Sequence, residues 1–549
     1  MRKTARKLAA LVLAVLLIAG GVSFCYAAEE RVPVILIPGF GQSETRVYDE
    51  NGEFMGEINS FNLPNLDAKE LVFDLVLPLL KSIVARKDVS LSVAAKEEVE
   101  KVFMPYLKND DGSYKYRTVV REYNLPFAQL PAEDRAELNH HIKMDGFPEF
   151  DNVRYYFSYD SFGSIRAVAE RLHNYLHNVV LAQTGASKVN FVPVSQGGTI
   201  FQEFLELYPE DYQYINKVIA MIPAYDGSII VGDVLTDNVT VYDLNYAHET
   251  VLPSLLGETD AAYAVSLALR FGLDDETTVK VLKAALGAAI DALVTRSSMM
   301  WALCPDDEFA VSLDKYLSDP ALSVVRAECE QYARARANFP AHLHQLMDSG
   351  VIVHNVVSYE EDLLFSTLFC SAGENSDELL APSSPSLGAV SARLGETLGD
   401  DYVSPHTYCS DPTHNHISPD GKIDASTGFL PENTWYFKGV GHTTMNSRND
   451  VKMFAVSLIL DDSITDVYSS EKFSQFTDPK QMIASSEQYG GYIYYYDADG
   501  NYMYAEAAPD AESGESGSSS PVTFLGVLHT IVNFIFRLLD MLGIHIKQL

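Results

Sequence analysis

Basic residues are scarce in this sequence. Of its 549 residues, 40 are lysine or arginine whereas 75 are aspartate or glutamate, which leaves a formal net charge of -35. A field of this sign repels polyanions and anionic membrane surfaces, and it favours solubility. We therefore expect no nucleic-acid partner, although the charge says little about the fold.

Cysteine is also rare, with five residues in the whole chain and no C-x-x-C pair. The missing pair argues against a thioredoxin-like site and against the commonest kind of structural zinc site. Four cysteines follow the N-terminal segment, and an even number permits two disulfides in an exported protein. Pairing of neighbours along the chain predicts Cys304–Cys329 and Cys370–Cys409, and four free thiols are the alternative.

The N-terminal 27 residues have the layout of a secretory signal peptide. Four cationic residues precede an apolar run that extends from residue 8 to about residue 22, and small residues follow at Ala27 and Ala28. This layout predicts a secreted or cell-surface protein that is cleaved near Ala27. Retention as an uncleaved anchor is the alternative, but the apolar run is short for a membrane span.

Strand-like and helix-like segments alternate in the first part of the chain. Residues 32–37 are a continuous apolar run that ends in Pro38-Gly39-Phe40-Gly41, which is typical of a buried strand followed by a tight turn. Further strands are expected over 152–159, 189–194 and 217–222, and helices over 165–185 and 199–208. This alternation predicts parallel βαβ units with right-handed crossovers.

Two long segments interrupt this alternation. The first, about 49–150, contains a predicted hairpin at YDENGEF and two helical patterns, and helical patterns dominate the second, about 228–350. Strands resume over 351–357 and 434–440, so that one sheet brackets the second segment. We therefore expect both segments to be insertions that cap the sheet. A separate helical domain is the alternative for the second.

The sequence beyond residue 460 divides into three parts. Residues 461–506 form an extension with an aromatic-rich hairpin pattern, 507–520 predict a flexible linker, and 521–549 are apolar. In the last part, one narrow polar stripe at helical spacing predicts an amphipathic helix that lies on a membrane surface or binds a partner. The stripe consists of His529, Asn533, Arg537 and Asp540. Folding back onto the body is the alternative, and the charges disfavour a transmembrane span.

A serine stands on a predicted strand-to-helix turn, in the stretch P-V-S-Q-G that contains Ser195. The stretch is a nucleophile elbow, G-x-S-x-G, in which Pro193 replaces the first glycine. Proline is acceptable at the last residues of a strand but not in its middle. Ser195 is therefore the candidate nucleophile, and the backbone N–H groups of Phe40 and Gln196 are the candidate oxyanion hole.

Two further candidates follow late in the chain. Asp420 lies in SPDGKID and His442 in KGVGHTTM, before and after the strand predicted over 434–440. The order Ser195, Asp420, His442 is that of an α/β-hydrolase triad, in which imidazole takes the serine proton and the carboxylate orients the ring. Each motif alone is weak, but their joint occurrence in this order, each next to a strand, favours catalysis.

The chain resembles the α/β-hydrolase superfamily, and within it secreted bacterial lipases and esterases and the lecithin:cholesterol acyltransferase-like group. The segments that carry the resemblance are scattered over residues 31–445: VPVILIPGFG, YYFSYDSF, KVNFVPVSQGG, KVIAMIPAYDGS, MWALCP and SPDGKIDASTGFLPENTWYFKGVGHTTM. It implies an α/β-hydrolase fold over 28–460, with a mostly parallel sheet flanked by helices and large helical cap insertions. Asp420 is favoured as the acid because D-G-K-I is similar to the family's D-G-x-V pattern.

Other polar residues compete for these roles. Glu360, Glu361 and Asp362 directly follow the strand predicted over 351–357, where many α/β-hydrolases carry their acid, and Asp424 is a further candidate. A second set, in SPHTYCSDPTHNHIS, offers a conceivable metal cluster, for which a polar loop beside the active site is the favoured interpretation. It consists of His406, Asp411, His414 and His416. We therefore expect no metal and no cofactor.

The function expected from the sequence is hydrolysis of a carboxylic ester. The two apolar, helical insertions resemble lipase caps that shield a lipid substrate, so a lipid-derived ester is favoured. Acyl transfer between lipids and cleavage of an amide or peptide are enzymatic alternatives. A non-catalytic cell-surface binding protein on a decayed hydrolase fold is an alternative of a different class, motivated by Pro193 and the long acidic insertions.

Overall fold

The computed structural model describes residues 31–58, 68–142, 151–251, 270–409, 411, 413–445, 448–470, 473–477, 486–489, 492–496 and 502–506. The predicted signal peptide (1–27), linker (507–520) and C-terminal helix (521–549) lie outside these residues, so the structure does not bear on them. Across the described ranges, the model contains no helix with the length and apolar character that a membrane crossing requires.

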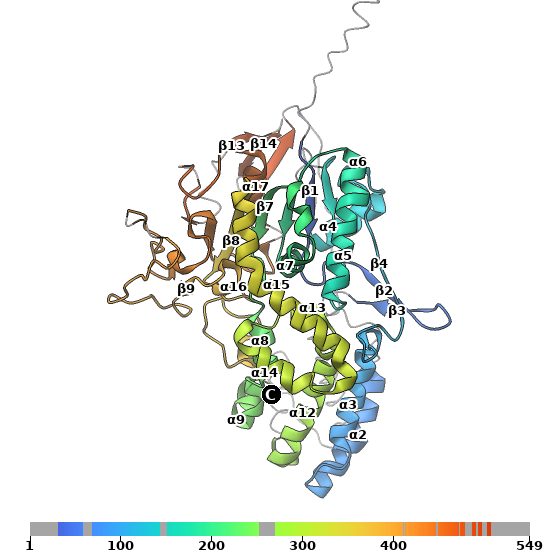
Figure 1. Ribbon diagram of the computed structural model, residues 1–549. Coiled ribbons are helices and arrows are strands. Elements are labelled where there is room, and N and C mark those ends of the chain that lie inside the picture. Colours follow the sequence, from blue (N-terminus) through green and yellow to red (C-terminus); the bar gives the residue numbers. More distant parts are fainter. Residues whose placement is uncertain are drawn as a thin grey trace, which may run out of the picture.

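A parallel sheet of seven strands forms the centre of the protein (Figure 1), in the order β12-β11-β8-β7-β6-β1-β5. Every neighbouring pair in this sheet is parallel. The strands are β1 (Val34–Ile37), β5 (Arg154–Tyr156), β6 (Val189–Pro193), β7 (Ile215–Met221), β8 (Ile352–Tyr359), β11 (Thr434–Lys438) and β12 (Phe476–Thr477). The predicted α/β class and the predicted parallel strands are confirmed.

Helices cover both faces of this sheet. On one face α5 (Ile165–Tyr175), α7 (Gly197–Leu207) and α15 (Ser323–Asp348) share an apolar core with alternate residues of the strands. On the other face α17 (Asn449–Leu460) packs on the strand residues of opposite parity. Successive side chains of a strand point to opposite faces, so strands covered on both sides must be apolar almost throughout. The continuous apolar runs in the sequence have this cause.

Large parts of the two insertions form one lobe, whereas Tyr123, Phe127, Leu130 and Leu138 of the first insertion pack on Tyr156 of β5. In the first, β2 (Thr45–Tyr48) pairs with β3 (Phe54–Glu57), which confirms the hairpin predicted at YDENGEF, and also with β4 (Arg117–Val120). Helix α3 (Leu91–Val102) of the first insertion packs against α12 (Asp275–Ile290) of the second, next to α2 (Ala68–Ala85) (Figure 1). Both segments also contribute to one buried apolar cluster, so each insertion stabilises the other.

The last part of the second insertion differs from expectation. Helix α15 lies within the range predicted as cap, 228–350, but its side chains Phe339, Leu343 and Leu346 are buried against the sheet. Most of α15 is therefore a layer of the α/β body, whereas its first turns, with Val325 and Cys329, belong to the apolar cluster of the lobe. At the far end of the chain, β13 (Ser486–Tyr489), β14 (Tyr492–Tyr496) and β15 (Tyr502–Glu506) form an antiparallel sheet, which contains the hairpin predicted within 461–506.

The predicted disulfides are wrong, because all four cysteines of the described chain are free. Cys304 and Cys329 are buried in the apolar cluster of the lobe, and burial raises the pKa of the Cys304 thiol to about 12. Cys370 is exposed, whereas Cys409 is buried beside His414. Cys304 and Cys329 share one cluster as free thiols, whereas the fold places Cys370 and Cys409 in different environments.

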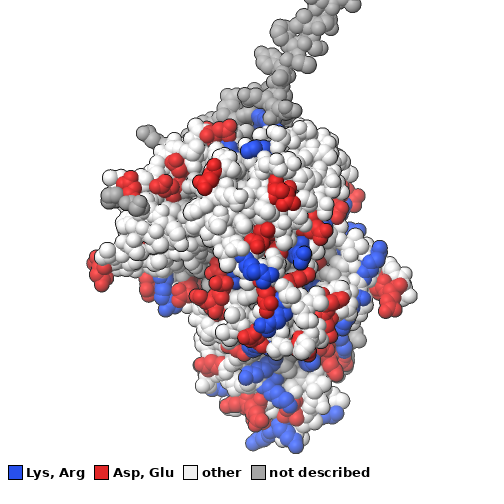
Figure 2. Space-filling model, in the orientation of Figure 1, with Lys and Arg blue, Asp and Glu red and all other residues white. Residues whose placement is uncertain are grey.

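Charge is unevenly distributed over the face shown in Figure 2. Acidic and basic side chains are interspersed over the lower, helical lobe, whereas the upper part of this face is largely uncharged apart from scattered acidic residues and a few basic ones. Ion pairs such as Lys280–Asp88, at 2.5 Å between Nζ and Oδ2, join the two insertions.

Candidate active site

Ser195 stands on a sharp turn between β6 and α7. Its φ of 51° is in the left-handed region, where a residue with a side chain is strained, and its N–H donates to the Met221 carbonyl at 3.1 Å. The Ser195 carbonyl accepts from the Ala224 N–H at 2.8 Å, so the turn is held from both sides. The side chain is partly exposed. The predicted strand-to-helix elbow is therefore present.

Glycines let three backbone segments approach this turn closely. A Cβ atom on Gly197 would lie 2.3 Å from the Ile37 carbonyl oxygen, and one on Gly198 would lie 2.7 Å from the Pro223 side chain. A Cβ atom on Gly39 would lie 3.1 Å from Cβ of Ser195. Real Cβ atoms do not approach other atoms to within 3.0 Å. Gly197 therefore allows α7 to begin against the end of β1, and Gly198 allows it to begin against the segment that follows β7.

Pro193 is accommodated at the end of β6, in the interior of the sheet. The N–H groups of Asn190 and Val194 donate toward β1, and the N–H of Ser195 donates to β7. Because donors alternate along a parallel strand, the N–H that proline lacks would have faced β7. The regular β6–β7 pairing stops at Phe191 and the two strands meet again at Val194. The proline therefore interrupts one ladder locally and leaves the elbow intact.

His442 follows β11 and reaches Ser195. Its Nε2 lies 2.8 Å from the Ser195 hydroxyl oxygen, as predicted for the base of the site. Its Nδ1 lies 2.8 Å from Oδ2 of Asp377, a fully buried residue in the loop after β8. Asp377 can only accept when ionised, so Nδ1 carries the proton and Nε2 presents its lone pair to the serine hydroxyl. This arrangement can move the hydroxyl proton of Ser195 onto the ring.

Asp377 is held rigidly. Its second oxygen, Oδ1, accepts from the N–H groups of Leu379 at 3.1 Å and Leu380 at 2.8 Å. Its own main-chain carbonyl accepts from the His442 N–H at 2.6 Å. The carboxylate thus has every oxygen occupied, which is what a buried charge requires. Both the position and the tautomer of His442 follow from this one residue.

The prediction that Asp420 orients His442 is wrong. Asp420 lies in a turn between β9 (Val390–Ser391) and β10 (Ile423–Asp424), where it accepts from the Ser418 hydroxyl at 2.6 Å and pairs with Lys438 at 3.0 Å. Its D-G motif therefore forms a local turn rather than a contact with the ring. The rival candidates also bind elsewhere: Glu360 pairs with Lys422 at 2.6 Å, Asp362 accepts from Ser366 at 3.0 Å, Asp424 accepts from Tyr402 at 2.8 Å, and the Glu361 main chain pairs with Ser376.

Sequence reasoning missed Asp377, although the signal was partly visible. The loop after the strand predicted over 351–357 was named as a position for the acid, and Asp377 lies in that loop, beyond the three residues that were considered. The stretch Ser376-Asp377-Glu378 forms a turn in which the Asp377 side chain binds its own following backbone. A search of the whole loop for such a turn would have included Asp377.

Glu378, the residue after Asp377, binds Thr443, the residue that follows His442. Its Oε2 accepts from the N–H of Thr443 at 2.8 Å and from its hydroxyl at 2.6 Å. A Cβ atom on Gly441 would lie 2.5 Å from the Glu378 carboxylate, so only glycine fits there without displacing that side chain. The two sides of the histidine turn are therefore fixed by two consecutive acidic residues.

The candidate oxyanion donors lie on segments that flank Ser195. The hydroxyl of Tyr159 donates to the Pro38 carbonyl at 2.7 Å and lies 3.3 Å from Oε1 of Gln196, so it contacts both segments. Gln196 is fully buried and starts α7, where the helix dipole favours negative charge. The ring of Phe40 packs edge-on against Phe162 at 5.2 Å. The stretch YYFSYDSF thereby braces the loop that carries the Phe40 N–H.

Among the residues that the structure describes, two groups of side chains outside the triad could hold a metal ion. One is Cys409, His414, His416 and Glu432, and the other is His173, His177 and Asp211. The sequence had suggested His414 and His416 together with His406 and Asp411. Asp411 lies 3.8 Å from Nε2 of His414, on the side of the ring that faces away from the group, and His406 is exposed. The fold therefore replaces two members of the predicted set with Cys409 and Glu432.

No protein-family model matches this chain, and no curated protein matches it significantly. Among solved structures, a chain from "The crystal structure of Tle4-Tli4 complex" is similar at 13% sequence identity, with a TM-score of 0.35. The match covers 78% of this chain and 98% of that chain. Likeness of this degree carries no conclusion on fold or function, so that the geometry of the site is what the functional argument rests on.

Proposed function

We propose that this protein is a serine hydrolase of the α/β-hydrolase fold that cleaves carboxylic esters. The observation that carries the proposal is the chain of two 2.8 Å hydrogen bonds from Ser195 through His442 to the buried Asp377. The serine follows β6, the acid follows β8 and the base follows β11. Because the carboxyl ends of parallel strands meet at one edge of a sheet, residues far apart in the sequence converge there.

The reaction proceeds through an acyl-enzyme. The Ser195 oxygen attacks the ester carbonyl carbon while its proton passes to Nε2 of His442. The N–H groups of Phe40 and Gln196 stabilise the resulting oxyanion. The tetrahedral intermediate then collapses, and His442 returns the proton to the leaving alcohol. A water molecule, deprotonated by the same nitrogen, attacks the acyl-enzyme and releases the carboxylic acid with Ser195 regenerated.

An exposed apolar stripe on the lobe supports a lipid-derived ester as the substrate. Leu77, Leu80 and Val84 lie on one face of α2 and are 56%, 40% and 85% exposed. Nearby Phe271 is 81% exposed, and the next residue, Gly272, approaches Ile83 of α2. Exposed apolar patches of this kind mark surfaces that bind other apolar material. Since the chain is strongly acidic, a neutral lipid aggregate fits better than an anionic membrane.

A fluorophosphonate probe tests the proposal directly. We expect covalent labelling of Ser195 in the folded protein and none in Ser195→Ala. Ser323→Ala is the matched control, because Ser323 is an exposed serine on α15 and should not affect labelling. A folded wild-type protein that does not react at Ser195 would favour the non-catalytic binding protein. Supplying an alcohol acceptor and measuring acylated alcohol against free acid distinguishes acyl transfer from hydrolysis.

A further inference from the structure

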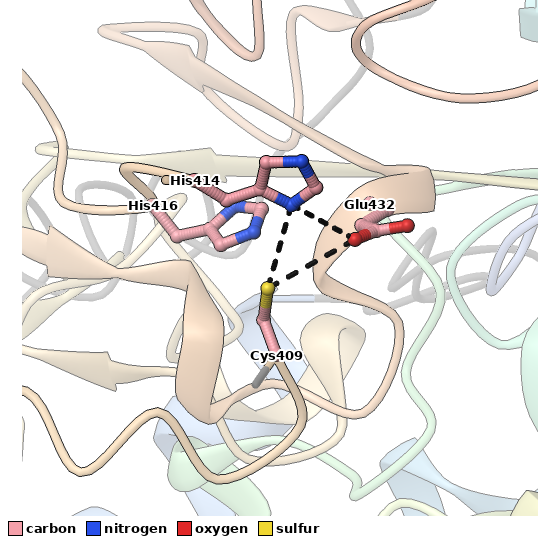
Figure 3. Close-up of side chains that lie close together, drawn as sticks. All are labelled: Cys409, His414, His416 and Glu432. Atoms are coloured by element: carbon pink, nitrogen blue, oxygen red, sulfur yellow. Dashed lines mark hydrogen bonds and ion pairs between the residues drawn. The ribbon is translucent and has the colours of Figure 1, made fainter. Parts of the chain in front are cut away.

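Four potential metal ligands meet beside the sheet (Figure 3). Cys409, His414 and His416 lie in the connection between β9 (Val390–Ser391) and β10 (Ile423–Asp424). Glu432 lies in the one-turn helix Pro431–Asn433, directly before β11. One ligand atom of each residue lies within 4.8 Å of those of the other three.

The distances between three of these atoms match a tetrahedral site. Nδ1 of His414 lies 3.6 Å from the Cys409 sulfur and 3.0 Å from Oε1 of Glu432, and the sulfur lies 3.9 Å from that same oxygen. For zinc bonded to sulfur at about 2.3 Å and to nitrogen and oxygen at about 2.0 Å, tetrahedral angles place neighbouring ligand atoms about 3.3 to 3.6 Å apart. The observed distances lie around these values.

The Cys409 thiol makes only long hydrogen bonds within this group. Its proton can point to Oε1 of Glu432 at 3.9 Å or to Nδ1 of His414 at 3.6 Å, whereas Nδ1 of His414 lies 3.0 Å from the Glu432 carboxylate. A cation placed between the three atoms would interact favourably with all of them at once.

The fourth residue, His416, is oriented by Gln475. The Gln475 Nε2 donates to the carbonyls of Pro431 at 2.5 Å and Thr434 at 3.1 Å, which fixes the orientation of the amide. Its Oε1 must then accept from Nδ1 of His416, at 2.9 Å. The proton of His416 is therefore on Nδ1, and the lone pair of Nε2 accepts from the Tyr468 hydroxyl at 3.2 Å. A metal ion bound at Nε2 would replace this hydrogen bond. Metal-binding histidines are commonly held in this way, with the second nitrogen donating to a protein oxygen.

We propose that Cys409, His414, His416 and Glu432 bind one Zn²⁺ ion as a structural site. A thiolate and two imidazoles favour zinc over calcium and magnesium, which prefer oxygen ligands. Four protein ligands leave no open position for substrate or water. On binding, the Cys409 thiol releases its proton to solvent, and the thiolate, the carboxylate and the two imidazole lone pairs fill the coordination sphere.

The position of the proposed zinc site indicates a role in stabilising the fold and no direct role in catalysis. Glu432 precedes β11 and His442 follows it, and β11 has five residues. A strand rises about 3.3 Å per residue, so the strand alone separates the two sites by roughly 16 Å. The ion would tie the long β9–β10 connection to the start of the strand that carries the catalytic base.

Metal analysis of the full chain, without an affinity tag, tests the proposal. The protein is equilibrated with excess zinc, desalted and assayed by mass spectrometry of the metal. We expect about one zinc per chain, a loss of this zinc in Cys409→Ser and in His414→Ala, and a lower unfolding temperature after treatment with EDTA. Cys370→Ser and His406→Ala are the matched controls, since both residues are exposed and outside the group, and they should retain the zinc.

Cobalt(II) gives a second readout that needs no variant to fold. Cobalt-loaded wild-type protein should show the absorption of a tetrahedral site with a thiolate ligand. His177→Ala should leave both readouts unchanged, because it alters only the other histidine pair. The proposal is overturned if desalted wild-type protein holds no zinc above the Cys409→Ser level, or if bound cobalt shows no thiolate band.

Discussion

Asp377 and His442 are joined through their main chains as well as through their side chains. The Asp377 carbonyl accepts from the His442 N–H at 2.6 Å, and its carboxylate accepts from the ring at 2.8 Å. The loop after β8 and the turn after β11 are therefore positioned together. Rigid placement of this kind is what an orienting residue requires, because a displaced ring loses its contact with the serine.

Replacing Asp377 and Asp420 one at a time should show which of the two carboxylates orients His442. We expect Asp377→Asn to lower kcat on a soluble ester by roughly 10⁴-fold, because an amide can donate to Nδ1 and then favours the wrong tautomer of His442. Asp420→Asn should leave kcat within a few-fold of wild type, since Asp420 binds Ser418 and Lys438 instead. Thermal unfolding of both variants checks that they fold. Equal losses of kcat in two folded variants would contradict this assignment of the acid.

The close approach of backbone segments at the elbow predicts opposite effects of alanine on stability at Gly197 and at Gly287. Gly197→Ala should lower the free energy of unfolding by roughly 3 kcal/mol or more, because the new methyl group would overlap the Ile37 carbonyl. Gly287→Ala is the control. Gly287 lies within α12 with nothing within 4 Å of a Cβ atom, so alanine should raise stability by about 0.5 to 1 kcal/mol. Denaturant titration measures both, and a Gly197→Ala variant as stable as wild type would refute the predicted overlap.

A buried acid behind the elbow should make stability depend on pH. Glu203 of α7 is fully buried, and burial raises its pKa to about 7. Within the described chain neither of its carboxylate oxygens has a hydrogen-bond partner. An unfolded glutamate loses its proton near pH 4.3, so between about pH 4.3 and 7 the folded state binds more protons and stability falls as pH rises.

The variant Glu203→Gln removes this titration. At pH 8 we expect its free energy of unfolding to exceed that of wild type by roughly 3 kcal/mol, and at pH 4 we expect the two to be nearly equal. Glu206→Gln is the contrasting variant, because Glu206 is held by His342 at 2.8 Å and its loss should destabilise. Urea unfolding at both pH values is the measurement. A gain for Glu203→Gln that is as large at pH 4 as at pH 8 would rule out titration as the cause.

The apolar stripe on α2 predicts dependence on the physical state of the substrate. The double variant Leu77→Asp, Val84→Asp should lower the rate on an emulsified neutral lipid ester by roughly tenfold, since two side chains could no longer enter the lipid surface. The kcat/KM value on a soluble short-chain ester should be unchanged. Val311→Asp, at an exposed apolar position of α14 (Asp306–Tyr316), is the control. Equal loss on both substrates would point to damage to the site rather than to the interface.

The sequence by itself determined the parts of this protein that depend on local pattern. The strand-like runs predicted six of the seven strands of the sheet, all but β12, because strands buried on both faces cannot include many polar residues. The elbow around Ser195 and its glycines were visible because a sharp turn needs particular residues at particular positions. His442 was recognisable because it directly follows such a strand.

Only the tertiary structure decided which residues far apart in the sequence contact one another. Asp377 replaces Asp420 because a loop of irregular structure brings it to the ring, and no local pattern records where such a loop folds back. The two insertions form one lobe because α3 and α12 bury apolar faces that each would otherwise expose. Spacing along the chain also failed to predict which side chains come together in space. The four cysteines are free, and Cys409 lies beside two histidines and Glu432.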